Sequence, residues 1–196
     1  MIHQNLQGKR IILASQSPRR LELVKGLELE PVIRLKEVDE SYPDSLSGPA
    51  VAEYVTRKKA KAYLDDLENH DILITGDTVV ICDEEVLGKP KSDEEARAML
   101  HKLNGRSHTV ASGIAVTTRA QGIHSAVDTC EVTFTKLDSK LIDHYIKTYQ
   151  PFDKAGAYGV QDLIGFAGVT SLHGSYFTVM GLPTHLLFNL LNNLNS

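Results

Sequence analysis

The chain has 196 residues, 42% of them hydrophobic, and a formal net charge of -4 at pH 7. That composition is typical of a globular domain that is long enough to bury a sizeable core. A net negative charge argues against a surface that recruits nucleic acid or acidic lipid, so any anion-binding site must be local.

The sequence shows no pattern of a targeting or membrane-spanning segment. Residues 1–10 lack the apolar core of a signal peptide, and no run approaches the roughly 20 apolar residues of a membrane span. Cys82 and Cys130 form no C-x-x-C pair, which favours buried free thiols in a reducing cytosol. The histidines show no H-E-x-x-H spacing, which argues against a zinc site. We therefore expect a cytoplasmic protein with neither a membrane nor a nucleic-acid partner.

The first half of the chain begins with a strand, a tight turn and a helix. The apolar run Ile11–Ala14 predicts a buried strand. Ser17 is a suitable N-cap, Pro18 suits the first helical position and Gly26 suits the helix end. Further along, the pattern predicts a strand over Pro31–Val38, a loop over Ser41–Pro49 and a helix over about Pro49–Leu67.

The second half alternates strands and helices in the same way. Asp71–Ile81 is a β-branched apolar run interrupted by Gly76-Asp77, and Ser92 with Glu95 forms a capping box for a helix ending near Asn104-Gly105. The rest predicts strands near Thr109–Thr117 and Ile123–Leu137, a helix over about Ser139–Tyr149, a structured loop over 152–162 and a final helix from Pro183. Because two strand runs adjoin while others are separated by helices, we expect an α/β protein with a mixed sheet.

The segment SQSPRR, Ser15 to Arg20, places two arginines in the first turn of a helix. A cation there is disfavoured by about 0.3–1 kcal/mol because it faces the positive end of the helix dipole. The free backbone N–H groups and the hydroxyls of Ser15 and Ser17 suit an anion, and arginine binds phosphate through two parallel hydrogen bonds. A phosphate docked at this turn makes the position of Arg19 and Arg20 favourable. The alternative is that both arginines point into water, and the spacing alone does not decide.

Gly76-Asp77-Thr78 interrupts an otherwise apolar stretch. A carboxylate near the interior of a sheet costs several kcal/mol unless it is paired or bound to a metal. Gly76 lets the backbone bend or lets a ligand approach. The alternative is a turn at a strand end with a solvated aspartate.

Other charged residues give weaker signals. Lys89 lies between glycine and proline on a rigid turn that suits a phosphate, and Lys59 lies in the basic run RKKAKA. The segment EVDE, Glu37 to Glu40, supplies hard oxygen ligands for Mg²⁺ or Mn²⁺ after a strand. Solvated surface charges are the commoner explanation for each of these.

The loop FDKAGAYGVQD contributes Lys154 and Gln161. The amide of Gln161 is both donor and acceptor, so it can read the edge of a nucleobase, and the small residues let a ring approach the backbone. A tightly packed loop is the alternative. Taken together, cations for phosphates, carboxylates for metal and water, and a glutamine for a base suit the metal-assisted attack of water on a nucleotide phosphate.

Six motifs occur in order: LASQSPRRLELV, ITGDTVV, LGKP, LNGRSHTV, DKAGAYGVQD and VMGLP. From about Ile11 to Pro183 the chain resembles the Maf family of nucleoside triphosphate pyrophosphatases. The resemblance implies hydrolysis between the α and β phosphates, giving the monophosphate and pyrophosphate, with a divalent cation, Mg²⁺ or alternatively Mn²⁺. It also implies a single domain over residues 1–196 that forms a homodimer in the cytoplasm. The implied fold is an elongated mixed sheet with flanking helices and two lobes around a central cleft, similar to inosine triphosphate pyrophosphatase.

The resemblance also implies roles for individual residues. Asp77 matches the general base and a metal ligand, and Glu40 matches its partner at the metal. The residues around the triphosphate match Ser15, Arg19, Lys59 and Lys89, and those that select the base match Arg20, Thr78 and Gln161. Arg20 and Gln161 resemble the branch that acts on dTTP and UTP rather than the branch that acts on 7-methyl-GTP.

The chain departs from the family pattern at two places. Asp162 follows Gln161 where glycine or glutamate is common, so this extra acid either biases selectivity or faces solvent. Val55-Thr56 stand where Leu-Ala is common before Lys59, which leaves Lys58 as the fallback candidate. Two alternatives stay open: the same reaction on 7-methyl-GTP or another base, and a non-catalytic nucleotide-binding regulator of cell division.

Overall fold

The structure is a computed structural model that describes residues 6–194, so part of the N-terminal segment considered above lies outside it. It contains a seven-stranded sheet of order β2-β1-β3-β5-β6-β7, with β4 paired to β3. The strands are β1 (Arg10–Leu13), β2 (Val32–Ile33), β3 (Asp71–Cys82), β4 (Glu85–Leu87), β5 (Ser107–Thr118), β6 (Gly122–Phe134) and β7 (Val169–His173). β1 pairs in parallel with β2 and β3, and the other pairings are antiparallel. The predicted mixed α/β sheet is confirmed.

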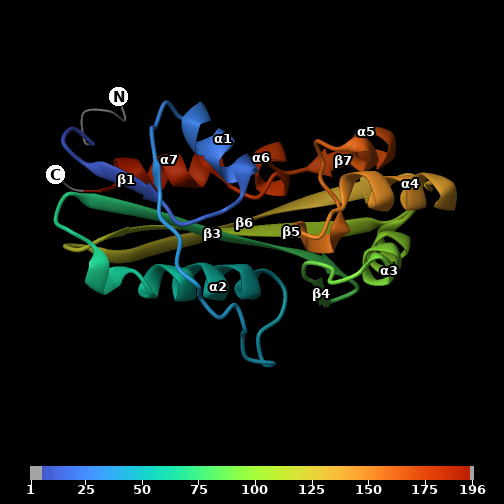
Figure 1. The fold of residues 1–196 in the computed structure, drawn as a ribbon, viewed down its shortest axis with the longest axis horizontal. Helices are drawn as coiled ribbons and strands as arrows, with labels where there is room; N and C mark the ends of the chain where they lie inside the picture. Colours follow the sequence, from blue (N-terminus) through green and yellow to red (C-terminus); the bar gives the residue numbers. More distant parts are fainter. Residues whose placement is uncertain (1–5, 195–196) are drawn as a thin grey trace.

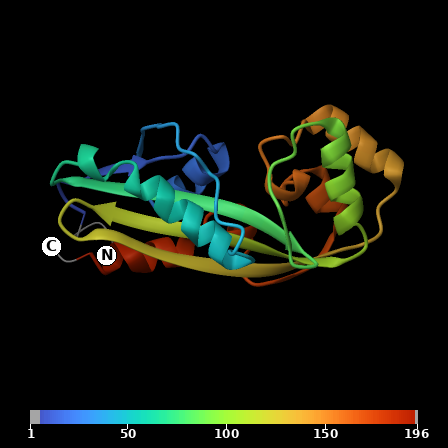
Figure 2. The ribbon, with the colours of Figure 1, turned by 90° about the horizontal axis from the view of Figure 1, so that it is seen from below.

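Helices cover the sheet unequally along its length. They are α1 (Pro18–Gly26), α2 (Pro49–Lys61), α3 (Asp93–Leu103), α4 (Ser139–Tyr149), α5 (Leu163–Gly168), α6 (Tyr176–Val179) and α7 (Thr184–Asn192), with 3-10 turns η1 (Leu64–Asp66) and η2 (Ala155–Ala157). Figure 1 shows α2 on one face of the sheet and α1, α6 and α7 on the other, while α3, α4 and α5 gather at the far end. The molecule is therefore elongated, and β3, β5 and β6 run from one lobe to the other (Figure 2).

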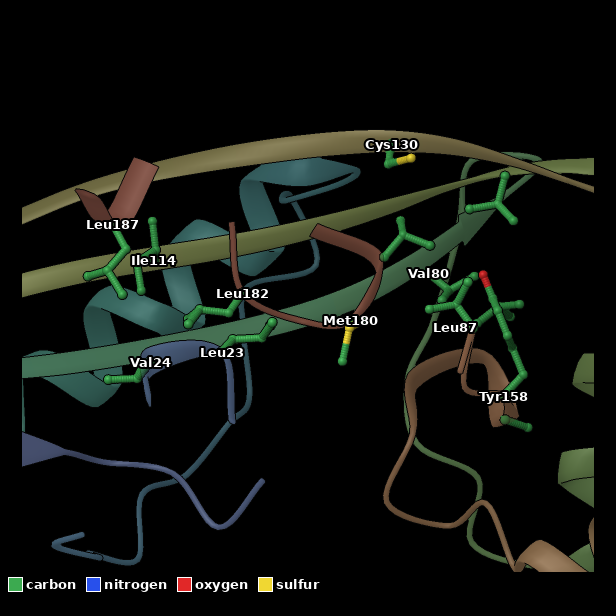
Figure 3. Close-up of a cluster of buried hydrophobic side chains, with 14 of the residues drawn as sticks. Leu23, Val24, Val80, Leu87, Ile114, Cys130, Tyr158, Met180, Leu182 and Leu187 are labelled. Atoms are coloured by element: carbon green, nitrogen blue, oxygen red, sulfur yellow. The ribbon is translucent and has the colours of Figure 1, made fainter. Parts of the chain in front are cut away.

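The core follows from the alternation of side chains along the long strands. On one face, a single cluster extends into both lobes: Ile114 of β5 lies near Leu187 of α7 and Val24 of α1, and Val80 of β3 lies farther along, near Leu87 of β4 (Figure 3). On the other face, Val79 of β3 packs with α2 in a smaller cluster. Because helices pack on both faces of the sheet, polar residues of β3 can reach solvent only beyond the ends of these helices.

Helix capping agrees with the sequence pattern. The Ser17 hydroxyl accepts from the backbone N–H of Arg20, so α1 begins with Pro18 as expected. Ser92 accepts from the backbone N–H of Glu95 at the start of α3. Gly105, just after that helix, has a positive φ of 69°. The capping signals therefore fix the start of α1 and both ends of α3.

Several predicted boundaries were wrong. β2 covers only Val32–Ile33, whose side chains are 56% and 45% exposed at the edge of the sheet, so the alternation over Pro31–Val38 does not make a long strand. α2 ends at Lys61 instead of near Leu67, and η1 follows it. β3 covers the predicted run and continues through Gly76-Asp77, so the alternative of a turn at a strand end was wrong. By contrast, α1 ends at Gly26 as expected, and the left-handed residue after it is Glu28, with a φ of 59°.

Candidate active site

A cleft with a volume of about 630 Å³ opens between the two lobes. All nine site residues expected from the sequence line it: Ser15, Arg19, Arg20, Glu40, Lys59, Asp77, Thr78, Lys89 and Gln161. They come from α1 and the turn before it, from the segment after β2, from α2, from β3, and from the two loops that follow β4 and α4. The structure thus gathers in one place residues that are far apart in the chain. Their roles remain predictions.

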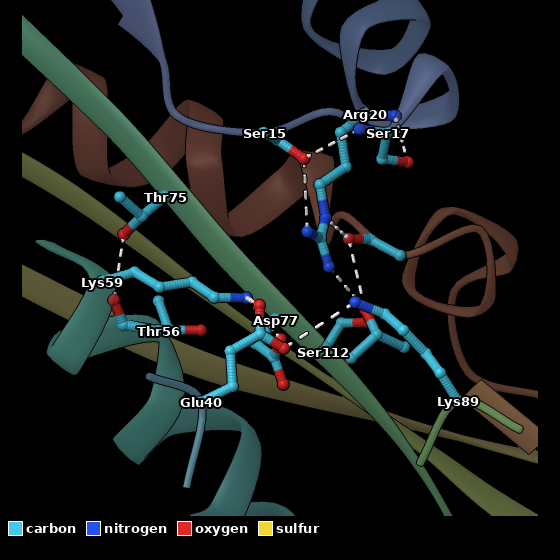
Figure 4. Close-up of polar contacts among 12 residues, drawn as sticks. Ser15, Ser17, Arg20, Glu40, Thr56, Lys59, Thr75, Asp77, Lys89 and Ser112 are labelled. Carbon is cyan, nitrogen blue, oxygen red and sulfur yellow. Dashed lines mark hydrogen bonds and ion pairs between the residues drawn. The ribbon is translucent and has the colours of Figure 1, made fainter. Parts of the chain in front are cut away.

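The turn before α1 forms one wall of the cleft. Ser15 is buried, and its Oγ accepts from the backbone N–H of Ser17 at 3.2 Å. The Arg20 guanidinium lies below this turn and donates to the Ser15 hydroxyl at 3.4 Å (Figure 4). This turn and the first residues of α1 therefore line a cavity that already contains cationic side chains, while the backbone N–H groups of Ser17 and Arg20 are bonded to serine hydroxyls.

Arg20 is held by the protein on three sides. Besides Ser15, its Nε donates to the carbonyl oxygen of Gly181 at 2.8 Å, and Nη2 donates to the Thr78 hydroxyl at 3.1 Å. Burial lowers the pKa of this guanidinium. A guanidinium has five N–H groups, so two of them stay available to a ligand. Arg20 does not point into water, and that alternative was wrong for it.

Arg19 reaches across the cleft instead. Its Nη1 lies 3.1 Å from Oδ2 of Asp153, which belongs to the opposite lobe. Lys154 pairs with the same carboxylate at 2.8 Å. Burial opposes ionisation of Asp153, but the hydrogen bond from Lys154 and the two cations outweigh it, and the pKa of that carboxyl lies below its usual value. Sequence reasoning missed Asp153, because a partner 134 residues away leaves no local signal.

Lys59 joins the two acidic residues of the site. Its Nζ lies 2.8 Å from Oδ1 of Asp77 and 2.8 Å from Oε1 of Glu40 (Figure 4). Lys89 lies 3.7 Å from the other oxygen of Glu40. Burial opposes ionisation of Glu40, yet the hydrogen bond and charge of Lys59 prevail, and the pKa of this carboxyl is lowered. Asp77, only 8% exposed, is thus a paired carboxylate and not the solvated aspartate of a turn.

The neighbouring Lys58 lies elsewhere. It pairs with Asp39 at 2.8 Å and also donates to the carbonyl oxygen of Ser41, both on the exposed segment after β2. Lys59 is therefore the lysine of α2 that enters the cleft, and the fallback candidate is not needed.

Two glycines allow this close packing. A Cβ on Gly76 would lie 3.0 Å from the carbonyl oxygen of Gly113 and 3.6 Å from Arg20 Nε. A Cβ on Gly113 would lie 2.5 Å from the Thr56 hydroxyl and 2.6 Å from the Ala52 carbonyl oxygen of α2. Gly113 therefore lets α2 approach β5 closely, one turn before Lys59. Sequence reasoning found Gly76 but missed Gly113, whose need arises from a distant helix.

Asp77 and Glu40 fit the requirements of a hard divalent cation in one respect. Mg²⁺ is usually held by one or two carboxylates together with substrate phosphates, not by a complete protein cage. Among residues 6–194 there is no group of three or more histidine, cysteine or acidic residues that could hold a metal alone. The two carboxylates, each with one oxygen on Lys59, match a site that substrate phosphates complete.

The opposite wall contains Gln161 and Asp162. Within the described residues the Oε1 atom of Gln161 is buried without a hydrogen-bond partner, which is costly unless a ligand supplies a donor. Asp162 accepts from the Tyr145 hydroxyl at 2.9 Å and lies 3.6 Å from Lys154 Nζ. Its side chain is 17% exposed, so it braces the loop that contains Lys154 and does not face solvent.

The whole chain resembles proteins of known fold and name. Among solved structures, a HAM1 protein from Coxiella burnetii is 16% identical, with a TM-score of 0.49 over 95% of this chain and 100% of that one. A protein of Phocaeicola vulgatus is 46% identical over 97% of this chain and 99% of its own length, and one of Bacteroides thetaiotaomicron is 47% identical over 97% and 98%. A protein of Flavobacterium psychrophilum is 42% identical over 98% of both. All three relatives are named dTTP/UTP pyrophosphatase. The family model described as "Maf-like protein" matches residues 10–194, and the chain therefore belongs to the Maf family.

Proposed function

We propose that this protein is a nucleoside triphosphate pyrophosphatase that hydrolyses dTTP and UTP between the α and β phosphates. The products are the monophosphate and pyrophosphate. The observation that carries the proposal is a cluster of cations around one buried carboxylate, with Lys59 in contact with Asp77 and with Arg19 and Lys89 on the same cleft. The names of the relatives, which are 41–47% identical over nearly their whole length, support the choice of nucleotides.

The triphosphate is bound by cations from both lobes. Lys59, Lys89 and Arg19 line the cleft together with the first turn of α1, and all of these favour phosphate oxygens. Arg19 and Lys154 are held by Asp153 in the structure, so a phosphate competes with that carboxylate for them. Arg19 and Lys154 stay paired with an anion during this exchange, because the phosphate takes the place of the Asp153 carboxylate.

Asp77 is the group that directs water to the phosphorus. Its Oδ1 is held by Lys59 at 2.8 Å, which fixes the carboxylate and leaves the second oxygen to accept a proton from a water molecule. The developing charge on the phosphate oxygens is balanced by the surrounding lysines and arginine.

We propose that Asp77 and Glu40 hold a divalent cation together with the substrate phosphates, Mg²⁺ or alternatively Mn²⁺. When bound, such an ion neutralises phosphate charge and polarises the scissile bond. Lys59, which lies between the two carboxylates, contacts and orients both in the free protein.

Arg20, Thr78 and Gln161 select the base. The two free N–H groups of Arg20 suit carbonyl oxygens of uracil and thymine, and the unpartnered Gln161 Oε1 suits an N–H donor. A 7-methylguanine base carries a positive charge, which the Arg20 guanidinium repels. The pyrimidine reading is therefore favoured over 7-methyl-GTP.

A panel of nucleotides tests the proposal. Pyrophosphate release is measured with Mg²⁺ and dTTP, UTP, CTP, GTP or 7-methyl-GTP. We expect fast release from dTTP and UTP alone. A preference for 7-methyl-GTP contradicts the assignment of Arg20 and Gln161, and binding of nucleotides without any release supports the non-catalytic regulator instead.

Membership of the Maf family supports two further proposals, on location and assembly. We propose that the protein acts in the cytoplasm, to which its free, buried Cys82 and Cys130 are suited, and that it forms a homodimer. Light scattering coupled to size exclusion tests the homodimer directly. Within residues 6–194 no helix is both long and apolar enough to span a membrane.

A further inference from the structure

A row of two hydroxyl groups, of half-buried Thr78 and buried Ser112, leads from the cleft into the sheet. Thr78 on β3 lies opposite Ser112 on β5, and their hydroxyl oxygens are 2.8 Å apart. Ser112 is fully buried, and its Oγ lies 2.8 Å from the backbone carbonyl oxygen of Thr178 (Figure 4 labels Ser112). Ser112 thus connects a residue of the cleft wall to the backbone of α6.

The partners fix the direction of every hydrogen bond in this row. A carbonyl oxygen only accepts, so the single O–H of Ser112 is donated to Thr178. The hydrogen bond between Ser112 and Thr78 must then be donated by the Thr78 hydroxyl. Thr78 has two other contacts: Arg20 Nη2 donates to its hydroxyl at 3.1 Å, and the Gly181 carbonyl oxygen lies 3.4 Å away, farther than the Ser112 hydroxyl at 2.8 Å. Thr78 therefore has no proton left for a ligand and can only accept from one.

This direction matters for the base that the cleft recognises. Arg20 contributes N–H donors and Thr78 contributes an acceptor, side by side on the cleft wall. Uracil and thymine present a carbonyl oxygen next to an N–H, which is the complementary pattern. Cytosine presents an amino group next to an unprotonated nitrogen, which is the opposite pattern.

We propose that Ser112 is a positioning residue that locks the Thr78 hydroxyl as an acceptor and thereby sets the preference for uracil and thymine over cytosine. This inference rests on the proposed function, since it concerns base selection by the same cleft. Without Ser112 Oγ, the Thr78 proton is free to turn toward the Gly181 carbonyl oxygen at 3.4 Å or toward the ligand. A turned hydroxyl donates to cytosine as readily as it accepts from uracil.

The test is the discrimination between dTTP and CTP, the ratio of their kcat/KM values for pyrophosphate release. We expect Ser112→Ala to lower this ratio at least fivefold, because the freed Thr78 hydroxyl can then donate to cytosine. Thr75→Val is the matched control, because it removes another fully buried hydroxyl, from β3, that bonds to the Thr56 carbonyl oxygen away from the cleft. It should leave the ratio within twofold of wild type.

A double-mutant cycle shows whether Ser112 acts through Thr78. In a Thr78→Val background, Ser112→Ala should change the ratio no further. A folded Ser112→Ala protein with an unchanged dTTP/CTP ratio overturns the proposal. It is also overturned if Ser112→Ala lowers this ratio in the Thr78→Val background as much as it does in the wild-type protein. If Ser112→Ala fails to fold, Ser112→Cys repeats the test, because a thiol fills similar space but accepts a hydrogen bond only weakly.

Failure of the proposed function gives a different result. If the wild-type protein releases no pyrophosphate, discrimination is measured by binding instead, as the difference between the thermal stabilisation by dTTP and that by CTP. Loss of that difference in Ser112→Ala supports the positioning role even then, and its persistence overturns it.

Discussion

Adjacent residues of the same type have different tasks in this cleft. Arg20 is held by three acceptors within its own lobe, whereas Arg19 extends to Asp153 in the opposite lobe. Lys58 and Lys59 differ in the same way, since one pairs with exposed Asp39 and the other with buried Asp77. Residue type alone therefore does not predict the role of a residue here, because that role depends on the direction in which its side chain points.

Arg19→Ala should weaken catalysis much more than folding. Its ion pair with Asp153 is partly exposed, so its loss costs at most about 1 kcal/mol of stability. The loss of a cation at the triphosphate should lower kcat/KM for dTTP by more than tenfold. Steady-state kinetics and thermal unfolding measure the two effects, and equal activity of the variant and wild type would refute a phosphate role for Arg19.

The two lysines of α2 offer a matched comparison. Lys59→Met should abolish most of the pyrophosphate release, because it leaves Asp77 and Glu40 without their shared cation. Lys58→Met removes the same charge one residue earlier and should leave kcat within twofold, because Lys58 lies outside the cleft lining. Similar losses in both variants would show that the lysines act only through overall charge.

Individual elements are stabilised by polar contacts that the hydrophobic pattern does not reveal. The loop from Asp153 to Asp162 is fixed by the Tyr145 hydroxyl of α4, which donates to Asp162 and accepts from the backbone N–H of Gly159 at 3.2 Å. A Cβ on Gly159 would lie 2.5 Å from Asp162 Oδ2, so the glycine makes room for this carboxylate. The loop is thus a rigid wall of the cleft.

Asp162→Asn should raise the KM for dTTP severalfold while changing kcat less. The amide still fits beside Tyr145 but no longer attracts Lys154, whose ammonium then loses its second anchor at the cleft. Asp143→Asn, an exposed acid on α4 that pairs with Arg97, is the control and should leave KM unchanged. A selective effect on kcat would argue against a binding role for this loop.

His108 on β5 makes stability depend on pH. Burial lowers its pKa to about 4, and the ring packs edge-on against Phe134 and Tyr158. Between pH 6.5 and about 4 the unfolded chain binds a proton at His108 that the folded protein excludes. The contribution of His108 to the free energy of unfolding is therefore complete above pH 6.5 and is lost as the pH falls toward 4. Its size is at most roughly 3 kcal/mol, from the difference between the two pKa values.

The corresponding variant is His108→Phe. Its free energy of unfolding, measured by urea titration from pH 7 to pH 4, should fall less steeply than that of wild type. Parallel curves for the two proteins would show that His108 does not titrate on unfolding.

At the scale of the whole molecule, the cleft is a local cationic region on a chain of net negative charge. Long strands common to both lobes hold its two walls, and Arg19 with Asp153 links them. A substrate with several negative charges is therefore attracted to one place while the rest of the surface repels it.

Ionic strength should show this attraction. Because salt screens charges over about 8 Å at 0.15 M, we expect kcat/KM for dTTP to fall severalfold as KCl rises from low to high concentration. The fall should appear in KM and be smaller in the Arg19→Ala variant. Salt-independent kinetics would contradict an electrostatic role for the cleft.

The sequence predicted the order of the main elements and the residues of the site better than their boundaries. Capping residues such as Ser17 and Ser92 act locally, so their effect is legible in the sequence. The short elements β4, α5, β7 and α6 were not predicted, because they are held by tertiary contacts and show little hydrophobic periodicity. Asp153, Ser112 and Gly113 escaped for the same reason: each matters only through a partner on a distant strand or helix.

We propose that Asp77 directs water to a nucleoside triphosphate bound in this cleft. Pyrophosphate release from dTTP with Mg²⁺ by the wild-type protein and by Asp77→Asn, with thermal unfolding of both, tests this role. We expect release by the wild type and a loss of about 10²- to 10⁴-fold in kcat in the folded variant. A folded Asp77→Asn protein that releases pyrophosphate at the wild-type rate would contradict it.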